Sequence, residues 1–187
     1  MPALLFSISG VRGIVGDSLT PQVVSDFGKA FGSFINRGKI VIGQDTRKSG
    51  NILKKSFIEG ILSTGCDVID LGILPTPTIL FNIKSLGAAG GAIITASHNP
   101  KEWNGIKFAN QEGIFLNDSK MRELSNIYET KSWPRVSSND VGAIGTDNRG
   151  GERHIEGIIR TLEVNLIRSK QFKVVLDAGG GTVSIVG

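Results

Sequence analysis

The sequence predicts a three-layer α/β/α domain with a mainly parallel, mixed sheet, followed by the truncated start of a second α/β domain. Three observations carry this prediction. Short apolar runs alternate with stretches of helical spacing, which is typical of α/β proteins with a buried sheet. The 25 glycines fall mostly in short loops between these runs. Polar loops follow several of the runs, and ligands of such sheets bind beyond the carboxyl ends of the strands.

The first elements set the pattern. An apolar run at 4–8 ends at the glycine-rich stretch SGVRG, which we expect to be a flexible loop. Thr20 then offers an N-cap hydroxyl and Pro21 a suitable first helical residue, so a helix is expected from there to Gly38. The run KIVIG at 39–43 predicts a buried strand.

The alternation continues to about residue 130. The further predicted elements are an amphipathic helix from Ile52 to Leu62, a strand at 66–72, a short helix at TILFNIKS, a strand at 90–95, a hairpin through GIKFAN and GIF, and a helix near 118–129.

The last part of the chain differs in composition. Residues 131–151 lose periodicity and gain Ser, Asn, Asp and Gly, which predicts a loop or a domain linker. We therefore divide the chain into a first domain at 1–149 and an incomplete second domain at 150–187. The second unit is expected to contain one helix with an apolar face, a strand at 172–177 and the loop AGGGT. The apolar face of that helix is formed by Ile155, Ile158, Ile159, Leu162 and Leu166. A strand with so little chain after it cannot bury both faces, so we expect this unit to be cut short.

Composition excludes several classes of protein. The net charge of +4 and the pI near 9.3 are compatible with an anionic ligand such as a phosphate ester. Lysines and arginines form no dense stripe, so nucleic acid is not an expected partner. Cys66 is the only cysteine, which excludes an intramolecular disulfide and a cysteine-based zinc site. The N-terminus lacks the features of a signal peptide and no apolar stretch has membrane-spanning length, so we expect a cytoplasmic protein without a membrane partner.

The stretch TASHNP at 95–100 places a serine, Ser97, at the exit of an apolar strand. It is either an ordinary strand-to-loop junction or a serine displayed for chemistry. A serine hydrolase needs a held base and usually a GxSxG elbow, and the sequence around Ser97 contains neither. His98 is not automatically a base, because neighbours in an extended chain point to opposite sides. Acyl transfer is therefore not expected.

A phosphorylated serine has different requirements. It carries close to two negative charges and needs cations and N–H groups around it. Arg12, in SGVRG, and Lys107, in NGIKF, can supply the cations if the loops cluster. Asn104 and Gly105 predict a turn between the serine and Lys107. Along GIKF, the side chain of Lys107 is expected to point away from its two apolar neighbours.

Other interpretations of the same residues stay open. Arg12 is as well explained by ordering a loop as by binding a ligand. For Asp45 and Arg47 we favour a local ion pair that holds the loop QDTR. His98, taken alone, fits a hydrogen-bonded turn residue. The acidic residues show no clustered metal-ligand spacing.

The stretch VVLDAGGGT resembles the phosphate-binding turn of the actin and heat-shock chaperone ATPases, which makes a fragment of such an ATPase a weaker alternative.

Four segments together resemble the α-D-phosphohexomutase superfamily, which includes phosphoglucomutases, phosphomannomutases and phosphoglucosamine mutases. They are SGVRG at 9–13, GQDTRKSG at 43–50, TASHNPKEWNGIKF at 95–108 and LDAGGGT at 176–182. The resemblance covers nearly the whole chain in order. Two details depart from the family pattern: FSISGVRG stands where F-G-T-S-G-x-R-G is common, and Gly180 stands where Asn is frequent.

The resemblance implies that Ser97 is a phosphoserine that exchanges its phosphoryl group with a hexose 1- or 6-phosphate through a bisphosphorylated sugar. Arg12 and Lys107 match positions of charge stabilisation and proton transfer. His98 and Asn99 would shape the serine loop, and Asn104 and Gly105 belong to the same substrate-facing motif.

The resemblance also implies one Mg²⁺ per complete active site, bound in part by the phosphate on Ser97, and an activator of the glucose 1,6-bisphosphate type. The remaining metal ligands and the sugar-recognition loops belong to family domains that this sequence does not include. We therefore expect the chain to need the remaining domains of a parent protein and to be inactive alone. The alternative is a non-catalytic sugar-phosphate binding or regulatory module.

Overall fold

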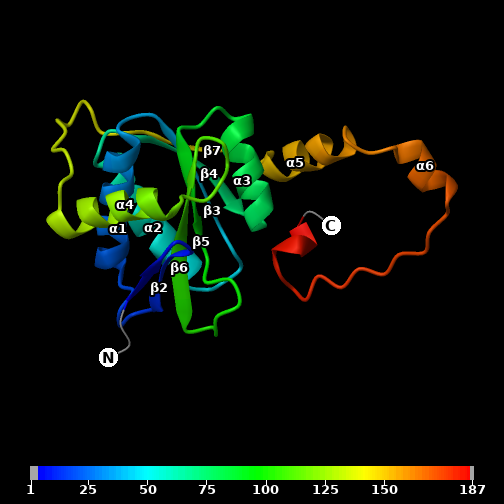
Figure 1. Ribbon diagram of the computed structural model, residues 1–187, viewed down its shortest axis with the longest axis horizontal. Helices are drawn as coiled ribbons and strands as arrows, with labels where there is room; N and C mark the ends of the chain where they lie inside the picture. The colour runs from blue at the N-terminus through cyan, green and yellow to red at the C-terminus, as the bar shows by residue number, and fades with distance from the viewer. Residues whose placement is uncertain (1–3, 186–187) are drawn as a thin grey trace.

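The computed structural model describes residues 4–185, so the outermost residues of both predicted domains lie outside it. Its strands form one mixed sheet in the order β1-β2-β6-β5-β3-β4-β7 (Figure 1). Their bounds are β1 Leu5–Ser7, β2 Gly10–Ile14, β3 Lys39–Gln44, β4 Asp67–Ile73, β5 Gly90–Ile94, β6 Trp103–Asn110 and β7 Ile144–Thr146.

The direction of the strands decides where loops gather. Strands β5, β3, β4 and β7 run parallel to one another, whereas β6 is antiparallel to both of its neighbours, β5 and β2, and β1 is antiparallel to β2. The loops after β3, β4 and β5 therefore leave the sheet at the same edge. This is the edge at which open α/β sheets bind ligands.

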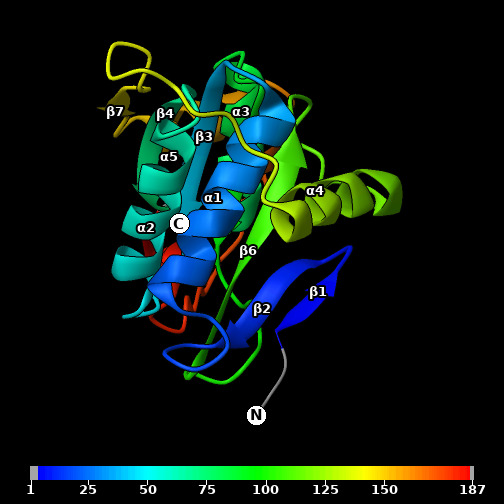
Figure 2. The ribbon, with the colours of Figure 1, turned by 90° about the vertical axis from the view of Figure 1, so that its left-hand side faces the viewer.

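Helices cover both faces of the sheet, as the three-layer prediction required (Figure 2). Helices α1, α2 and α4 pack on one face, and α3 packs on the other. The helices are α1 Pro21–Ile35, α2 Gly50–Leu62, α3 Thr76–Ser85, α4 Asp118–Thr130, α5 Gly150–Ile159 and α6 Val164–Ser169, followed by a short 3-10 helix at Thr182–Ile185.

Strand β3 shows why the apolar runs are continuous rather than alternating. Ile40 and Ile42 point into the cluster under α1, α2 and α4, while Val41 points into the cluster under α3. All three side chains are fully buried. A strand covered on both faces needs apolar residues at every position, and this is what KIVIG provides.

Helix α1 begins as predicted. The Thr20 hydroxyl accepts a hydrogen bond from the Val23 N–H at 3.3 Å, and Pro21 is the first helical residue. The helix ends at Ile35, before the expected Gly38, because Asn36 already adopts a left-handed conformation and its N–H bonds to Gly32.

Helices α1 and α2 cross closely at two glycines, Gly28 and Gly60. A Cβ placed on Gly60 would lie 2.1 Å from the carbonyl oxygen of Ser25 in α1. Helix backbones can approach this closely only where a side chain is missing. The hydrogen at Gly60 therefore sets the distance between the two helices.

Gly60→Ala is expected to destabilise the protein by about 1–3 kcal/mol, because the new methyl group must push the helices apart. The free energy of unfolding from urea titration measures this. Gly145→Ala is the matched control, since a Cβ at Gly145 meets no atom within 4 Å. Equal stability of the two variants would contradict the close crossing.

Three predictions for the chain after residue 130 are wrong, and the first two concern the linker and the helix that follows it. The predicted linker at 131–151 contains β7, which pairs with β4 through Val68 and Ile144. This strand has only three residues, too few to show a period in sequence. The single helix expected through Leu166 is two helices, α5 and α6. The five residues of its predicted apolar face are 39–57% exposed, so no packing of that face holds the segment between α5 and α6 in a helix.

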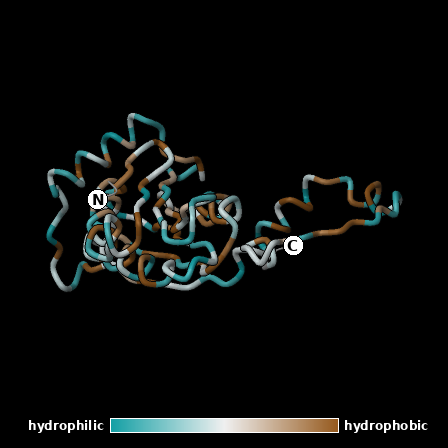
Figure 3. Tube along the Cα trace, turned by 90° about the horizontal axis from the view of Figure 1, so that it is seen from below, coloured by the Kyte–Doolittle hydropathy of each residue, from teal (hydrophilic) through white to brown (hydrophobic). Residues whose placement is uncertain are grey.

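The strand predicted at 172–177 is not formed. The segment is extended but exposed, with Val174 at 79% and Val175 at 90% exposure. No other strand within residues 4–185 pairs with it, and a strand needs a neighbour for its N–H and C=O groups. It lies apart from the sheet, as a largely apolar trace that leads back from α6 toward the body of the domain (Figures 1 and 3).

Helix α5 packs against α3, beyond the division that we placed at residue 149. Arg153 donates hydrogen bonds to the buried Asn82 of α3 and to Asp147, the latter at 2.6 Å. The Thr78 hydroxyl and His154 Nδ1 are hydrogen-bonded at 2.9 Å. The domain division itself stays a prediction.

Within the described residues, no helix combines the length and the apolar character needed to cross a membrane.

Candidate functional site

Ser97 lies two residues beyond Thr95, at the carboxyl edge of the sheet after β5. Its side chain is exposed and its φ angle is +56°, in the left-handed region that non-glycine residues rarely adopt. The Ser97 N–H donates to the Thr95 hydroxyl at 3.0 Å. That hydroxyl donates to a carboxylate oxygen of Asp45 at 2.7 Å. The serine is thus presented by a defined and unusual backbone conformation, which is frequent at functional sites.

Lys107 lies beside this serine. Its Nζ donates to Ser97 Oγ at 3.1 Å and lies 5.3 Å from the centre of the Phe115 ring. Its neighbours Ile106 and Phe108 point to the opposite side, into the core under α1, so the predicted orientation is confirmed. Partial burial, and then the positive charge of Arg12, lower the pKa of Lys107 below 10.5. A lysine with a lowered pKa can more readily exchange a proton with the hydroxyl that it contacts.

Arg12→Gln is expected to raise the pKa of Lys107. Removing a nearby positive charge favours the ammonium form, so the midpoint of deprotonation must move to higher pH. An NMR titration that follows the Lys107 side chain measures the shift. Arg135→Gln, at an exposed arginine of the loop after α4, removes the same charge elsewhere and should leave the midpoint unchanged. A midpoint that stays fixed in Arg12→Gln would exclude the electrostatic coupling.

Arg12 does not lie on a flexible loop, and this prediction is wrong. It belongs to β2, which pairs with β6 so that Arg12 is opposite Gly105. The guanidinium Nη1 donates to Asn99 Oδ1 at 2.7 Å. The pairing of β2 with β6 therefore carries the arginine to the serine loop, although 87 residues separate it from Asn99.

Asn104 and Gly105 do not form a turn either, because both lie within β6. A Cβ on Gly105 would lie 2.3 Å from the carbonyl oxygen of Val11, so the glycine is needed for the close approach of β2 rather than for a turn. Asn104 is buried and its Nδ2 donates to the Ser49 hydroxyl at 2.9 Å. It thereby links β6 to the start of α2.

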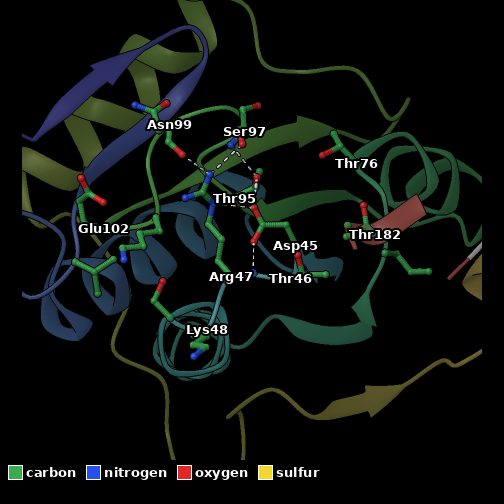
Figure 4. Close-up of a pocket in the computed structure, with 15 residues that line it drawn as sticks. Asp45, Thr46, Arg47, Lys48, Thr76, Thr95, Ser97, Asn99, Glu102 and Thr182 are labelled. Carbon is green, nitrogen blue, oxygen red and sulfur yellow. Dashed lines mark hydrogen bonds and ion pairs between the residues drawn. The ribbon is translucent and has the colours of Figure 1, made fainter. Parts of the chain in front are cut away.

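Asp45 and Arg47 form the expected ion pair, with Arg47 Nε 3.2 Å from Asp45 Oδ2. The contacts of Arg47 extend further than a local pair. Its two Nη atoms donate to four carbonyl oxygens of the segment after β5, at distances of 2.7–3.0 Å. These oxygens belong to Ser97, Asn99, Pro100 and Trp103. Figure 4 shows Arg47 reaching from one loop to the other.

His98 follows Ser97 in the turn, and its side chain is exposed. Within residues 4–185 its ring makes no hydrogen bond to a protein group. The structure thus joins Lys107 to Ser97 and Arg12 to Asn99 by hydrogen bonds, and leaves the His98 ring outside both contacts.

The serine opens onto a cleft of about 960 Å³ (Figure 4). Its lining includes Thr46 from the loop after β3, Thr76 at the start of α3 and Ser97 from the loop after β5, and the glycine-rich segment near the end of the described chain contributes Thr182. The volume and the polar lining suit a small polar ligand.

The described residues do not form a complete Mg²⁺ site. Within residues 4–185, no group of three or more His, Cys, Asp or Glu side chains is placed to hold a metal ion. Asp45, the carboxylate linked to Ser97 through Thr95, is already occupied by Thr95 and Arg47. A divalent ion at Ser97 would need oxygen ligands from elsewhere.

Sequence reasoning missed the roles of Thr95 and Phe115 at this site, and for Arg47 it predicted only the ion pair with Asp45. Thr95 binds the Ser97 amide, Arg47 binds the loop carbonyls, and Phe115 faces the Lys107 ammonium. A threonine two residues before the serine is a local signal that could have been used, since such hydroxyls commonly bond to the backbone two residues on. The contacts of Arg47 and Phe115 are long-range and leave no local signal.

Comparison with known proteins identifies the family of this chain. Residues 3–135 match the family model described as phosphoglucomutase/phosphomannomutase, alpha/beta/alpha domain I. A relative from Pyrococcus horikoshii, named "Probable phosphoglucosamine mutase", is 45% identical over 181 residues, which are 97% of this chain and 39% of that protein. A protein from Thermococcus kodakarensis named phosphoglucomutase/phosphomannomutase is 39% identical over 186 residues, covering 97% of this chain and 41% of the relative. The chain thus spans about two fifths of the length of these curated relatives.

Solved structures show the same fold. A phosphoglucomutase/phosphomannomutase family protein from Burkholderia thailandensis superposes with a TM-score of 0.68 at 25% identity, over 81% of this chain and 35% of the other. Parafusin, a phosphoglucomutase from Paramecium, superposes with a TM-score of 0.76 over 99% of this chain and 41% of the other, and at 18% identity it shows the fold alone. Because the family model covers most of the chain, this protein belongs to the phosphoglucomutase/phosphomannomutase family of the α-D-phosphohexomutase superfamily, and it contains that family's domain I.

Proposed function

We propose that this chain is the phosphoserine-bearing part of a phosphohexomutase, an enzyme that interconverts hexose 1-phosphate and hexose 6-phosphate. Ser97 carries the phosphoryl group, and a bisphosphorylated hexose is the intermediate. The observation that carries the proposal is the contact of 3.1 Å between Lys107 Nζ and Ser97 Oγ at the mouth of the cleft. A cation in that position suits a serine that alternates between hydroxyl and phosphate.

The transfer can be followed atom by atom. When a sugar bisphosphate reacts, Ser97 Oγ attacks phosphorus, a new O–P bond forms and the bond from phosphorus to the sugar oxygen breaks. Lys107, when deprotonated, takes the hydroxyl proton of Ser97, and the leaving sugar oxygen takes a proton from water. The resulting ammonium of Lys107 and the guanidinium of Arg12 then stand beside the new phosphate and stabilise its charge. The reverse sequence returns the phosphoryl group to the other oxygen of the hexose.

Substrate and metal follow from the family rather than from the described residues. The relatives are named for phosphoglucosamine, phosphoglucose and phosphomannose, so a hexose phosphate is the proposed substrate class. We propose that one Mg²⁺ supports the transfer, bound by the phosphate on Ser97 and by ligands outside the described residues. Those ligands, and the groups that recognise the sugar, would come from further domains. A bisphosphate of the glucose 1,6-bisphosphate type would charge the serine.

Intact-mass spectrometry tests the proposal. The protein purified from cells, or incubated with glucose 1,6-bisphosphate and Mg²⁺, is expected to gain the mass of one phosphoryl group, mapped by fragmentation to Ser97. In a coupled mutase assay the 187-residue chain alone is expected to show little or no turnover, because it spans only about two fifths of the length of its curated relatives. Phosphate found only at other residues would contradict the role of Ser97. Binding of hexose phosphate without any phosphorylation would favour a non-catalytic binding module.

A further inference from the structure

The position of Ser97 depends on a side chain from another loop. Arg47 follows β3, yet its guanidinium lies against the segment from Ser97 to Trp103, some fifty residues later in the chain. The Arg47 side chain is only 16% exposed, and its contacts with the carbonyl oxygens of Asn99 and Trp103 are partly shielded from water. Shielding strengthens hydrogen bonds to a charged group.

All the donor nitrogens of this guanidinium are used. Nε binds Asp45, Nη1 binds the carbonyl oxygens of Pro100 and Trp103, and Nη2 binds those of Ser97 and Asn99. A guanidinium presents its donors in a rigid planar fork. The four carbonyl oxygens that it binds are therefore fixed relative to one another and to Asp45.

Asp45 holds the peptide group on the other side of Ser97. Its Oδ2 accepts from the Thr95 hydroxyl, which in turn accepts from the Ser97 N–H. Its Oδ1 accepts from the Arg47 N–H at 2.9 Å. The amide and the carbonyl of Ser97 are thus both tied to one carboxylate, the first through Thr95 and the second through Arg47.

These hydrogen bonds, which tie both peptide groups of Ser97 to Asp45, explain the left-handed backbone conformation of Ser97. A non-glycine residue keeps such a conformation only where its surroundings impose it. Holding both flanking peptide groups fixes φ and ψ, and this in turn fixes the direction of the Cα–Cβ bond. The direction of that bond sets the contact between Ser97 Oγ and Lys107 Nζ.

We infer that Arg47 is a positioning residue, whose guanidinium holds the serine loop so that Ser97 Oγ faces Lys107 and the cleft. The functional part of this inference rests on the proposed phosphoryl transfer, whereas its structural part does not. A lysine at this position would keep the ion pair with Asp45 but would lack the fork, so it cannot bind all four carbonyl oxygens. The inference therefore predicts that a positive charge at position 47, without the guanidinium fork, does not hold the serine loop in place.

The test compares the 187-residue chain with its Arg47→Lys and Arg47→Gln variants. Lys55→Gln, at an exposed lysine of the following helix α2, is the matched control for loss of a positive charge. Amide hydrogen exchange is measured at Ser97 and Asn99, with the core amides of Ile42 and Phe31 as internal references. In both Arg47 variants, exchange at Ser97 and Asn99 is expected to rise about tenfold or more relative to the core amides, because hydrogen bonds to a charged group are lost. The control should match the wild type.

Phosphoryl loading of Ser97 from glucose 1,6-bisphosphate is the second measurement. It should slow at least about tenfold in Arg47→Lys, since misplacing a reacting atom is costly even when all the groups are present. Unchanged exchange at Ser97 and Asn99 in both variants would overturn the inference. An equal increase of exchange at the core amides would also overturn it, because Arg47 would then contribute to the stability of the whole domain rather than to the position of the loop. Faster loop exchange with no loading even in the wild type would leave the positioning intact and would refute the proposed function instead.

Discussion

Ser97→Ala is expected to abolish phosphorylation by a hexose bisphosphate and, in a complete mutase that carries this domain, to lower turnover by at least about a thousandfold. The reason is chemical, because Ser97 Oγ is the atom that forms the bond to phosphorus. Lys107 and Arg12 would remain in place, but without Ser97 Oγ no phosphoryl group is transferred whose negative charge they could stabilise. The measurements are intact mass after incubation with glucose 1,6-bisphosphate and a coupled assay for mutase turnover.

The Ser97→Ala variant needs a control for the loss of a hydroxyl group. Ser138→Ala removes an exposed hydroxyl from the loop before β7 and should be phosphorylated as the wild type is. Thermal unfolding of Ser97→Ala should resemble that of the wild type, because the Ser97 side chain is exposed. Normal phosphorylation of Ser97→Ala would show that another residue carries the phosphoryl group. Retained hexose-phosphate binding and biological function would point to a binding module.

Lys107→Met is expected to slow phosphoryl transfer to Ser97 by about 10²–10⁴-fold, the range for loss of a group that moves a proton in the transition state. The substitution removes both the proton acceptor and the positive charge beside Ser97 Oγ. The rate of phosphoryl loading, followed by mass over time, measures the effect. The methionine side chain keeps most of the contact with Phe115, so the loop after β6 should stay folded.

Lys107→Arg separates the two roles of the lysine. Arginine keeps the charge, but it stays protonated in proteins and cannot accept the proton. If proton transfer dominates, Lys107→Arg should be nearly as slow as Lys107→Met. If charge stabilisation dominates, it should recover most of the rate. Loading at the wild-type rate in Lys107→Met would remove Lys107 from the mechanism altogether.

The sheet could be predicted from the sequence because its elements depend on local patterns. The run at 39–43 is apolar at every position because β3 is covered on both faces, and Thr20 with Pro21 marks the start of α1. The failures have a common physical cause. The segment at 172–177 has a strand composition, but a strand forms only with a partner, and within residues 4–185 it has none. Composition cannot report whether a neighbour exists.

At the site, the sequence by itself determined which groups are available: a serine at a strand exit, a lysine on the polar side of the next strand, and an arginine near the start of the chain. It also indicated that Lys107 follows Ser97 by only ten residues, although the turn that it predicted at Asn104 and Gly105 is part of β6. The tertiary structure alone decided that β2 runs beside β6 and brings Arg12 to Asn99. It also decided that Arg47 leaves its own loop to bind the carbonyl oxygens of another. Local patterns follow from the geometry of a few consecutive residues, whereas these contacts join segments tens of residues apart and exist only once the sheet has formed.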